Sequence, residues 1–334
     1  MAPRNLVICC DGTGNEYGTR NTNVVELFKM LALDEPDRQI AFYDPGVGTM
    51  GDPSLNTGFG KSINKGLGLA FGRGMTRNIH DAYRYIMNSF HSGDRIFMFG
   101  FSRGAYTVRA LAGMIHKMGL LKKGSDNLIP YAIALYKKHP ETREDWRVVN
   151  GFKRTFSREV PIHFLGIWDT VKSVGWLRRR VVLDFTVNNK SVLHGRHAVS
   201  LDERRRQYQT NLWGYPNGEE FQEVWFPGVH SDVGGSYKEN GLSQISLKWM
   251  VEAAQKIGLI VDEQKRNAIQ GDPLGHLHNP LKPYWWMLGW KKRAIRRLEE
   301  NTDETVWIHC SVQARMNADP NYRPMLPSDC VFVD

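Results

Sequence analysis

The sequence predicts an α/β fold: a mostly parallel sheet with helices on both faces and helical insertions. Short apolar runs of strand length alternate with longer segments of helical periodicity, and this alternation is typical of parallel sheets. The apolar runs stop at short turns that contain glycine or aspartate. No internal repeat, low-complexity tract or clear linker divides the 334 residues, so we expect a single domain over residues 1–334.

The N-terminal part of the chain predicts three strands and two helices. The first helix is expected to begin at Asn23, because Asn is a favourable N-cap and Glu26 follows three residues later. Residues 46–74 are unusually rich in glycine and predict a long, mobile or ligand-covering loop. The second helix has four large apolar residues on one face, namely Ile79, Tyr83, Ile86 and Phe90. The strands are predicted over residues 6–10, 39–43 and 95–101.

The remainder of the chain continues this alternation around charged segments. Residues 120–160 are mixed and charged and predict a helical insertion, and a second helical insertion is expected over residues 265–300. Residues 176–220 carry many arginines and show no long periodic segment. Two further helices are expected to stop at Gly119 and Gly258. Strands are predicted over residues 162–168, 223–228 and 306–309.

The composition fits a soluble globular protein except for its formal net charge of +9. This charge favours an anionic partner, either nucleic acid, an acidic substrate or lipid headgroups. Nucleic acid is not expected, because the chain has no motif that reads it. The 4 cysteines, two of them adjacent in an apolar run, predict no disulfide framework and suit a reducing compartment. We find no signal peptide and no membrane-spanning stretch. We therefore expect a protein that is cytoplasmic as synthesised, and export by a specialised secretion system stays open.

The segment Gly100-Phe101-Ser102-Arg103-Gly104 carries the strongest functional signal. It is a Gly-x-Ser-x-Gly motif between a predicted strand and a predicted helix, which is the context of a nucleophile elbow. The turn is so tight that the positions on both sides of the serine require glycine, and it raises the serine above the sheet. The dipole of the following helix points at the reacting centre. We therefore predict an α/β-hydrolase-like fold with Ser102 as nucleophile, the alternative being a serine that only serves the turn.

A serine nucleophile needs a histidine base and a carboxylate that orients the histidine. In α/β-hydrolases these groups follow the order serine, acid, histidine along the chain. Ser102, Asp232 and His309 satisfy this order and lie near predicted strand ends, so we favour them. Asp169 is an alternate acid and His230 an alternate base, because each also follows a predicted strand.

An acyl-transfer site also needs backbone N–H groups that stabilise the oxyanion. One is expected from Arg103, directly after the nucleophile. The second is expected from Gly12 or Thr13, in the loop after the first strand. We expect Asp11 to brace this site loop, the alternative being an ordinary turn aspartate.

Residues 281–298 combine aromatic and cationic side chains and contain no acidic residue. If this segment is helical, an apolar stripe lies beside a cationic face, and such a segment can lie in an anionic membrane interface. The alternative is a helix docked on the core with a solvated basic face. The candidates for membrane contact are Trp285, Trp286, Trp290, Lys291, Lys292 and Arg293.

Five ordered motifs resemble one known group and cover nearly the whole chain. They are residues 10–15, 100–105, 166–171, 226–235 and 308–312. The chain resembles the uncharacterised α/β-hydrolase domain family that includes the type VI secretion phospholipase effectors (lipase effector family one). This resemblance implies a Ser-Asp-His hydrolase that acts on phospholipid acyl esters, and the family pattern favours Ser102, Asp232 and His309.

We therefore expect a serine ester hydrolase, phospholipase A-like, that acts through an acyl-enzyme and needs no metal or cofactor. The first alternative is an esterase or amidase that acts on a soluble small substrate. The second is a non-catalytic basic binding module for anionic lipid that keeps a hydrolase fold. The sequence leaves the oligomeric state open.

Overall fold

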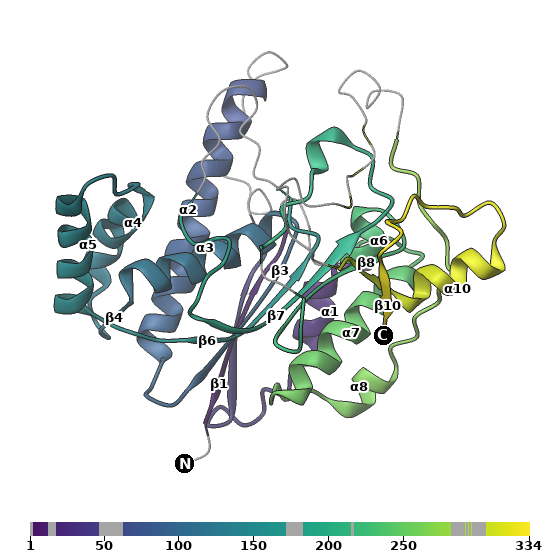
Figure 1. The fold of residues 1–334 in the computed structure, drawn as a ribbon. Helices are drawn as coiled ribbons and strands as arrows, with labels where there is room; N and C mark the ends of the chain where they lie inside the picture. The colour runs from purple at the N-terminus through teal and green to yellow at the C-terminus, as the bar shows by residue number, and fades with distance from the viewer. Residues whose placement is uncertain are drawn as a thin grey trace.

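The computed structural model describes residues 3–12, 18–46, 63–171, 183–214, 217–281, 291, 293, 295 and 305–334, without the side chains of 63–73 and 207. Within these residues, eight parallel strands form one sheet in the order β10-β9-β8-β7-β6-β3-β1-β2 (Figure 1). The strands are β1 (Asn5–Cys10), β2 (Gln39–Asp44), β3 (Arg95–Phe101), β6 (Ile162–Trp168), β7 (Val192–Ser200), β8 (Phe221–Phe226), β9 (Trp307–His309) and β10 (Val331–Val333).

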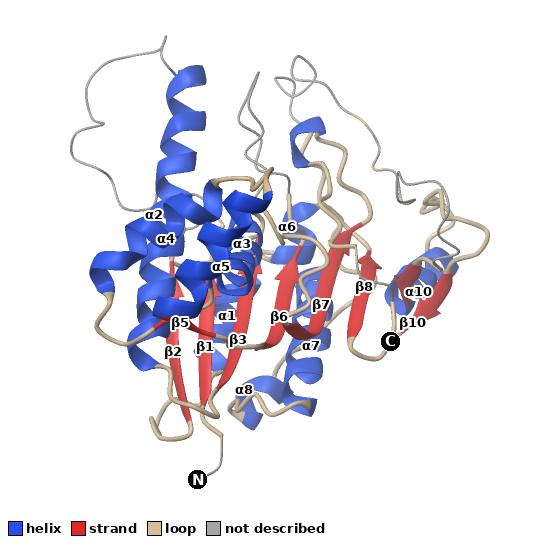
Figure 2. Ribbon diagram, turned by 60° about the vertical axis from the view of Figure 1, so that its left-hand side comes forward, coloured by secondary structure: helices blue, strands red, loops and turns tan. Residues whose placement is uncertain are grey.

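Helices cover both faces of this sheet, as Figure 2 shows. One face carries α2 (Ile63–Ser89) and α3 (Arg103–Met118), with α4 (Ile129–Lys137) and α5 (Arg143–Phe156) packed outside them. The opposite face carries α1 (Asn23–Met30) and α7 (Gly241–Lys256). The shorter elements are α6 (His230–Gly234), α8 (Glu263–Asn267), α10 (Cys310–Ala318), η2 (Asp126–Leu128) and η3 (Arg206–Tyr208). The predicted α/β fold class, a mostly parallel sheet with helices on both faces, is confirmed.

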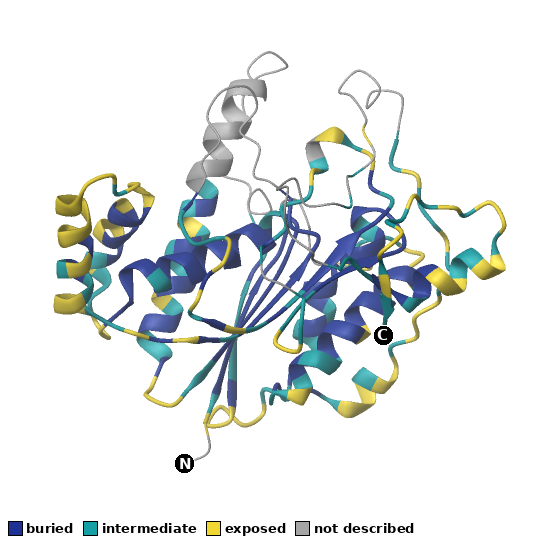
Figure 3. Cartoon of the chain, viewed as in Figure 1, coloured by how far each residue is buried: buried dark blue, intermediate teal, exposed yellow. Residues whose placement is uncertain are grey.

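The central strands are buried on both sides, which Figure 3 shows as a dark sheet between two helical layers. Successive side chains of a strand point to opposite faces. In β1, Leu6 and Ile8 therefore pack under α2 and α3, whereas Val7 and Cys9 pack under α1 and α7. This double burial explains why the central strands read as continuous apolar runs in the sequence.

Two predictions about individual segments need correction. Of the loop expected over residues 46–74, residues 63–74 belong to α2, and residues 47–62 lie outside the described residues. Helix extension costs little once a helix has nucleated, and the C-terminal half of α2 packs firmly on the core. The strand β7 lies inside residues 176–220, where no element was expected.

The insertion expected over residues 120–160 contains α4 and α5. It also contains a two-stranded antiparallel ribbon of β4 (Leu120–Leu121) and β5 (Ser157–Arg158). Of the insertion expected over residues 265–300, the helix α8 occupies only the first residues, and much of the rest lies outside the described residues. The division of the chain therefore stays a prediction.

Candidate active site

Ser102 lies in a sharp turn between β3 and α3. Its φ of 58° and ψ of −117° belong to a region that L-residues rarely adopt. A Cβ atom at Gly104 would lie 2.1 Å from the carbonyl oxygen of Cys10, and one at Gly100 would lie 2.6 Å from the carbonyl oxygen of Gly104. Both positions therefore require glycine, and the turn has the tight geometry that its motif predicts.

The register of the sheet brings Asp169 beside Ser102. Phe101, the last residue of β3, pairs with Trp168, the last residue of β6. The backbone N–H of Ser102 donates to the carbonyl oxygen of Trp168 at 3.0 Å. Ser102 and Asp169 are therefore the first residues beyond two neighbouring strands, at the carboxyl edge where ligands of open α/β sheets bind. The Asp169 side chain is fully buried.

His230 connects these two residues from the first position of α6, which follows β8. Its Nε2 lies 2.8 Å from Oγ of Ser102, and its Nδ1 lies 2.5 Å from Oδ2 of Asp169. Phe101 and Tyr208 hold the imidazole between them, with ring centroids at 4.6 and 4.8 Å. The result is a continuous hydrogen-bonded chain of serine, histidine and aspartate with the roles of a hydrolytic triad available.

The surrounding residues determine the protonation states of Asp169 and His230. Burial alone would raise the pKa of Asp169, but the cationic Arg293 and the hydrogen bond from His230 hold it well below its usual range. Burial lowers the pKa of His230, and its hydrogen bond to Asp169 only partly opposes this effect. At neutral pH the carboxylate is therefore ionised and the imidazole neutral, so Nε2 can accept a proton from the serine.

Asp232, the favoured acid, is held by another histidine. Its Oδ1 lies 2.6 Å from Nδ1 of His278, and its Oδ2 accepts a hydrogen bond from the backbone N–H of Val229 at 3.0 Å. Because Asp232 is the third residue of α6, its carboxylate folds back to the start of that helix. Asp232 therefore pairs with His278, and not with His309 as the sequence analysis had expected.

His309, the favoured base, is the N-cap of α10. Its Nδ1 accepts the backbone N–H of Ser311 at 3.1 Å, and its ring stacks on Phe226 at a centroid distance of 4.5 Å. The strand that carries it, β9, lies four places from β3 in the sheet. At about 4.8 Å per strand this separation is roughly 19 Å, too far for contact with Ser102. The structure brings the alternates, Asp169 and His230, to the serine instead.

The loop after β1 lies directly against the start of α3, where a side chain at Gly104 would strike it. Asp11 braces this loop through Oδ2, which accepts hydrogen bonds from Thr22 at 2.5 Å and Tyr43 at 3.0 Å. The N–H of Gly12 donates to Oδ1 of Asp11 at 2.6 Å, so a carboxylate already engages this oxyanion-hole candidate. Thr13 lies outside the described residues.

Arg103 is the first residue of α3 and directly follows Ser102. The role of its backbone N–H as an oxyanion donor stays a prediction. Burial lowers the pKa of the Arg103 guanidinium.

Two of the membrane-contact candidates are described, and they differ. Lys291 is exposed. Arg293 is buried, with 4% of its side chain accessible, and it forms ion pairs with Asp169 at 2.5 and 3.0 Å. Arg293 therefore does not face a membrane here, because its charge is neutralised inside the site. Trp285, Trp286, Trp290 and Lys292 lie outside the described residues.

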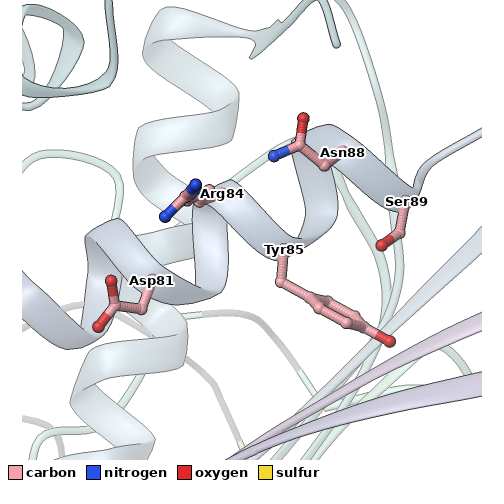
Figure 4. A pocket seen from close by; sticks show the side chains of 5 residues that line it. All are labelled: Asp81, Arg84, Tyr85, Asn88 and Ser89. Atoms are coloured by element: carbon pink, nitrogen blue, oxygen red, sulfur yellow. The ribbon is translucent and has the colours of Figure 1, made fainter. Parts of the chain in front are cut away.

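A surface hollow of about 330 Å³ runs along α2 and is distinct from this site (Figure 4). At one end of it, the carbonyl oxygen of Ser89 accepts a hydrogen bond from Arg4, just before β1 begins. The hollow therefore lies toward the amino edge of the sheet, opposite Ser102. Its lining residues are Asp81, Arg84, Tyr85, Asn88 and Ser89.

Within the described ranges, no helix combines the length and apolar character needed to cross a bilayer. Across those same ranges, no group of three or more His, Cys, Asp or Glu side chains is placed to hold a metal ion.

The sequence pattern did not predict that three further residues contact Asp169 or His230. Arg293 pairs with Asp169, the backbone N–H of Ser200 donates to Asp169 Oδ1 at 2.9 Å, and Glu203 accepts the backbone N–H of His230 at 3.2 Å. Ser200 and Glu203 follow β7, so recognising that strand would have placed them at the carboxyl edge. Arg293 comes from a distant segment, and only its place among many basic residues was visible.

Comparison with known proteins identifies the relatives of this chain. The family described as "T6SS, Phospholipase effector Tle1-like, catalytic domain" matches residues 4–253. "Uncharacterized protein YEL023C" of Saccharomyces cerevisiae is 39% identical over 219 residues, which cover 62% of this chain and 32% of that protein. The chain thus corresponds to about a third of the yeast relative.

Three solved structures are similar at lower identity. A crystal structure of a protein from Pseudomonas aeruginosa shares 18% identity, covers 81% of this chain and 49% of its own, and has a TM-score of 0.48. The Tle1 effector bound to the VgrG spike of the type 6 secretion system shares 19% identity, with coverage of 71% and 52% and a TM-score of 0.41. Zea mays acyl-protein thioesterase 2 shares 10% identity, with coverage of 76% and 95% and a TM-score of 0.34.

These TM-scores lie below 0.5, so the assignment rests on the sequence of the family. That sequence match spans most of the chain and includes Ser102, Asp169 and His230. The chain therefore belongs to the family of Tle1-like type VI secretion phospholipase effectors, which it matches through their catalytic domain.

Proposed function

We propose that this protein is a serine hydrolase that cleaves carboxylic esters with Ser102 as nucleophile, His230 as general base and Asp169 as the acid that orients the base. The single observation that carries this proposal is the hydrogen-bonded chain itself, with 2.8 Å from Ser102 to His230 and 2.5 Å from His230 to Asp169. The strained turn at Ser102 supports it, because such turns expose a nucleophile to its substrate.

The reaction follows from these contacts in two stages. Oγ of Ser102 attacks the ester carbonyl while Nε2 of His230 takes its proton, and the backbone N–H of Arg103 donates to the developing oxyanion. The protonated imidazole then gives its proton to the leaving alcohol, which departs and leaves an acyl-enzyme. In the second stage His230 takes a proton from a water molecule, which attacks the acyl group. The bond from the acyl carbon to Oγ of Ser102 then breaks, the imidazolium returns the proton to Oγ, and the carboxylic acid is released. Asp169 stays ionised and stabilises the imidazolium in both stages.

A phospholipid acyl ester is the substrate that the family membership supports best. The formal net charge of +9 supports it too, since a basic protein is attracted to anionic headgroups. The exposed Lys291 is one described residue through which the chain would meet such a membrane.

An active-site probe and paired variants test the catalytic assignment. A fluorophosphonate should label the folded protein at Ser102, and labelling should disappear in Ser102→Ala. It should fall strongly in His230→Gln and persist in His309→Gln, its matched control at the other histidine. Loss of labelling in His309→Gln but not in His230→Gln would contradict the proposed base. A protein that is folded yet never labelled at Ser102 would favour the non-catalytic lipid-binding module.

A substrate panel tests the lipid assignment separately. We expect release of fatty acid from phospholipid vesicles at a higher kcat/KM than hydrolysis of short soluble esters or amides. Vesicles with and without anionic lipid, each at low and high salt, measure the contribution of the positive charge. A preference for the soluble substrates would favour the alternative esterase or amidase function.

A further inference from the structure

Arg293 makes an unusually complete set of contacts for one side chain. Its Nη1 lies 2.5 Å from Asp169 Oδ1 and its Nη2 lies 3.0 Å from Asp169 Oδ2, so it grips both carboxylate oxygens. Nη1 also donates to the carbonyl and hydroxyl oxygens of Ser200 at 3.0 and 2.6 Å. Nε donates to the carbonyl oxygen of Tyr208 at 3.1 Å, and Nη2 donates to the same oxygen at 2.5 Å.

We propose that Arg293 is a positioning residue that fixes the Asp169 carboxylate against His230 and sets the proton affinity of that histidine. This inference rests on the proposed function of the Ser102 site. Arg293 reaches the site from a segment more than a hundred residues beyond β6, whereas the three triad residues occupy the ends of sheet strands and a helix start.

The planar fork of the guanidinium explains the positioning. A bidentate arginine fixes both the place and the plane of a carboxylate, which a single point charge cannot do. Oδ1 is held by Nη1 of Arg293 and by the N–H of Ser200, and Oδ2 is held by Nη2 of Arg293 while it faces Nδ1 of His230. Arg293 also holds the backbone of Tyr208, whose ring packs edge-on against the imidazole. It therefore restrains His230 from two sides.

The buried charge of Arg293 also acts on the proton affinity of His230. The charged or titratable groups that face this imidazole are Asp169 beyond β6, Glu203 beyond β7, Tyr208 in η3 and Arg293. Asp169 and Glu203 raise the pKa of His230, whereas Arg293 lowers it. Asp232, on the same helix, is engaged by His278. Burial lowers the pKa of His230 most, and Arg293 adds to this lowering by offsetting part of the negative charge of Asp169 and Glu203.

Two substitutions separate charge from geometry. Arg293→Gln removes both the charge and the guanidinium geometry. Arg293→Lys keeps the charge but loses the planar guanidinium that binds both oxygens of Asp169. We expect kcat on a soluble ester to fall about 10- to 100-fold in both, with little change in KM, by analogy with the loss of side chains that orient the ligands of a metal site. The acid limb of the kcat/KM profile should move to higher pH in Arg293→Gln and stay near that of the unchanged protein in Arg293→Lys. Arg147→Gln, which breaks the exposed Arg147–Glu144 pair, is the matched control and should leave both quantities unchanged.

Histidine NMR gives a readout that does not depend on turnover. The pKa of His230 should rise in Arg293→Gln and change little in Arg293→Lys. If either variant unfolds, Arg293→Ala with added guanidinium replaces it, and partial recovery of kcat supports the inference. An unmoved acid limb and an unmoved His230 pKa in folded Arg293→Gln would overturn it. Ser102 labelling of the unchanged protein keeps the two proposals apart, because its absence would defeat the hydrolase proposal and not the pKa result.

Discussion

Two aspartate–histidine pairs lie near each other around α6, and only one of them meets a serine. In the first, Nδ1 of His230 is 2.5 Å from Asp169, and in the second, Nδ1 of His278 is 2.6 Å from Asp232. The other ring nitrogen distinguishes them. Nε2 of His230 faces the Ser102 hydroxyl at 2.8 Å, whereas Nε2 of His278 faces the carboxylate of Glu239 at 3.4 Å.

The surroundings of the two pairs differ in charge as well. Arg293 binds the Asp169 carboxylate, and the pKa of Asp169 is held well below its usual range although burial opposes this. Within the part of the chain that the structure describes, Asp232 accepts from backbone N–H groups and pairs with His278 but with no arginine, and burial raises its pKa. An aspartate–histidine contact is therefore not by itself a catalytic unit. We propose that the first pair acts as one because its free nitrogen meets a nucleophile, and Arg293 helps to keep its acid ionised.

Replacing the histidine of each pair should give the largest contrast. His230→Gln removes the proposed base, and we expect kcat to fall by about 10⁶-fold, the loss measured for a hydrolytic histidine elsewhere. His278→Gln removes a partner of Asp232 and should leave kcat nearly unchanged, because the ring nitrogens of His278 face Asp232 and Glu239 and not Ser102. Initial rates on a soluble ester measure both. Comparable losses in the two variants would erase the distinction between the pairs.

Replacing the acids should give a smaller contrast in activity. Asp169→Asn leaves the shape but removes the charge that orients His230, and we expect a loss of about 10⁴-fold in kcat. Asp232→Asn should retain most of the activity and lower the free energy of unfolding by about 1–3 kcal/mol, because its buried hydrogen bonds to Val229 and His278 are weakened. Rates and urea unfolding curves of the two variants test whether Asp169 serves activity and Asp232 serves stability. A larger loss of activity in Asp232→Asn than in Asp169→Asn would contradict this prediction.

The sequence predicted the fold and the serine because both depend on local chemistry. Apolar runs mark the buried strands, and Gly100 and Gly104 are required by contacts within the turn itself. The choice of acid and base depends on lateral order in the sheet, which spacing along the chain does not encode. Chain order alone admitted both Asp169 and Asp232. The sequence analysis favoured Asp232, whereas Asp169 is the one that contacts the histidine beside Ser102.

The strand β7 explains much of that outcome. Its middle, His194-Gly195-Arg196-His197, contains no apolar side chain, although His197 is buried against Glu223 at 2.8 Å. The strand therefore lacks the continuous apolar run that marks the other central strands. Without β7, the strands β8 and β9 are expected one place nearer to β3 than they are. The role of Arg293 was hidden for a different reason, because a buried arginine is indistinguishable by sequence from the surrounding basic residues.

The two aspartates should titrate on opposite sides of the ordinary aspartate pKa. Asp232, with a raised pKa, should protonate above the ordinary aspartate value of about 3.9, whereas Asp169 should stay ionised below it. Asp169 therefore contributes stability that is present above about pH 3.9 and is lost as the pH falls toward its lower folded pKa. The lowered pKa of His230 places the acid limb of activity below about pH 6.5.

Carbon NMR of the carboxyl groups and a pH profile of kcat/KM measure these quantities together. Asp232→Asn is the control that identifies the earlier titration. Equal pKa values for Asp169 and Asp232 would show that Arg293 does not lower the pKa of Asp169.

The smallest effect is expected at His309, where the sequence analysis had placed the base. Its imidazole accepts the N–H of Ser311 as the cap of α10, and burial lowers its pKa to about 4, so it is neutral and able to accept at ordinary pH. His309→Ala should therefore lower the free energy of unfolding by about 0.5–2 kcal/mol, as the loss of an N-cap does. His309→Asn, which restores a side-chain acceptor, should recover much of this loss. The kcat of both variants on a soluble ester should equal that of the unchanged protein, because β9 lies four strands from β3. A drop in kcat in both, at unchanged stability, would return His309 to the chemistry and leave the contact between His230 and Ser102 without a function.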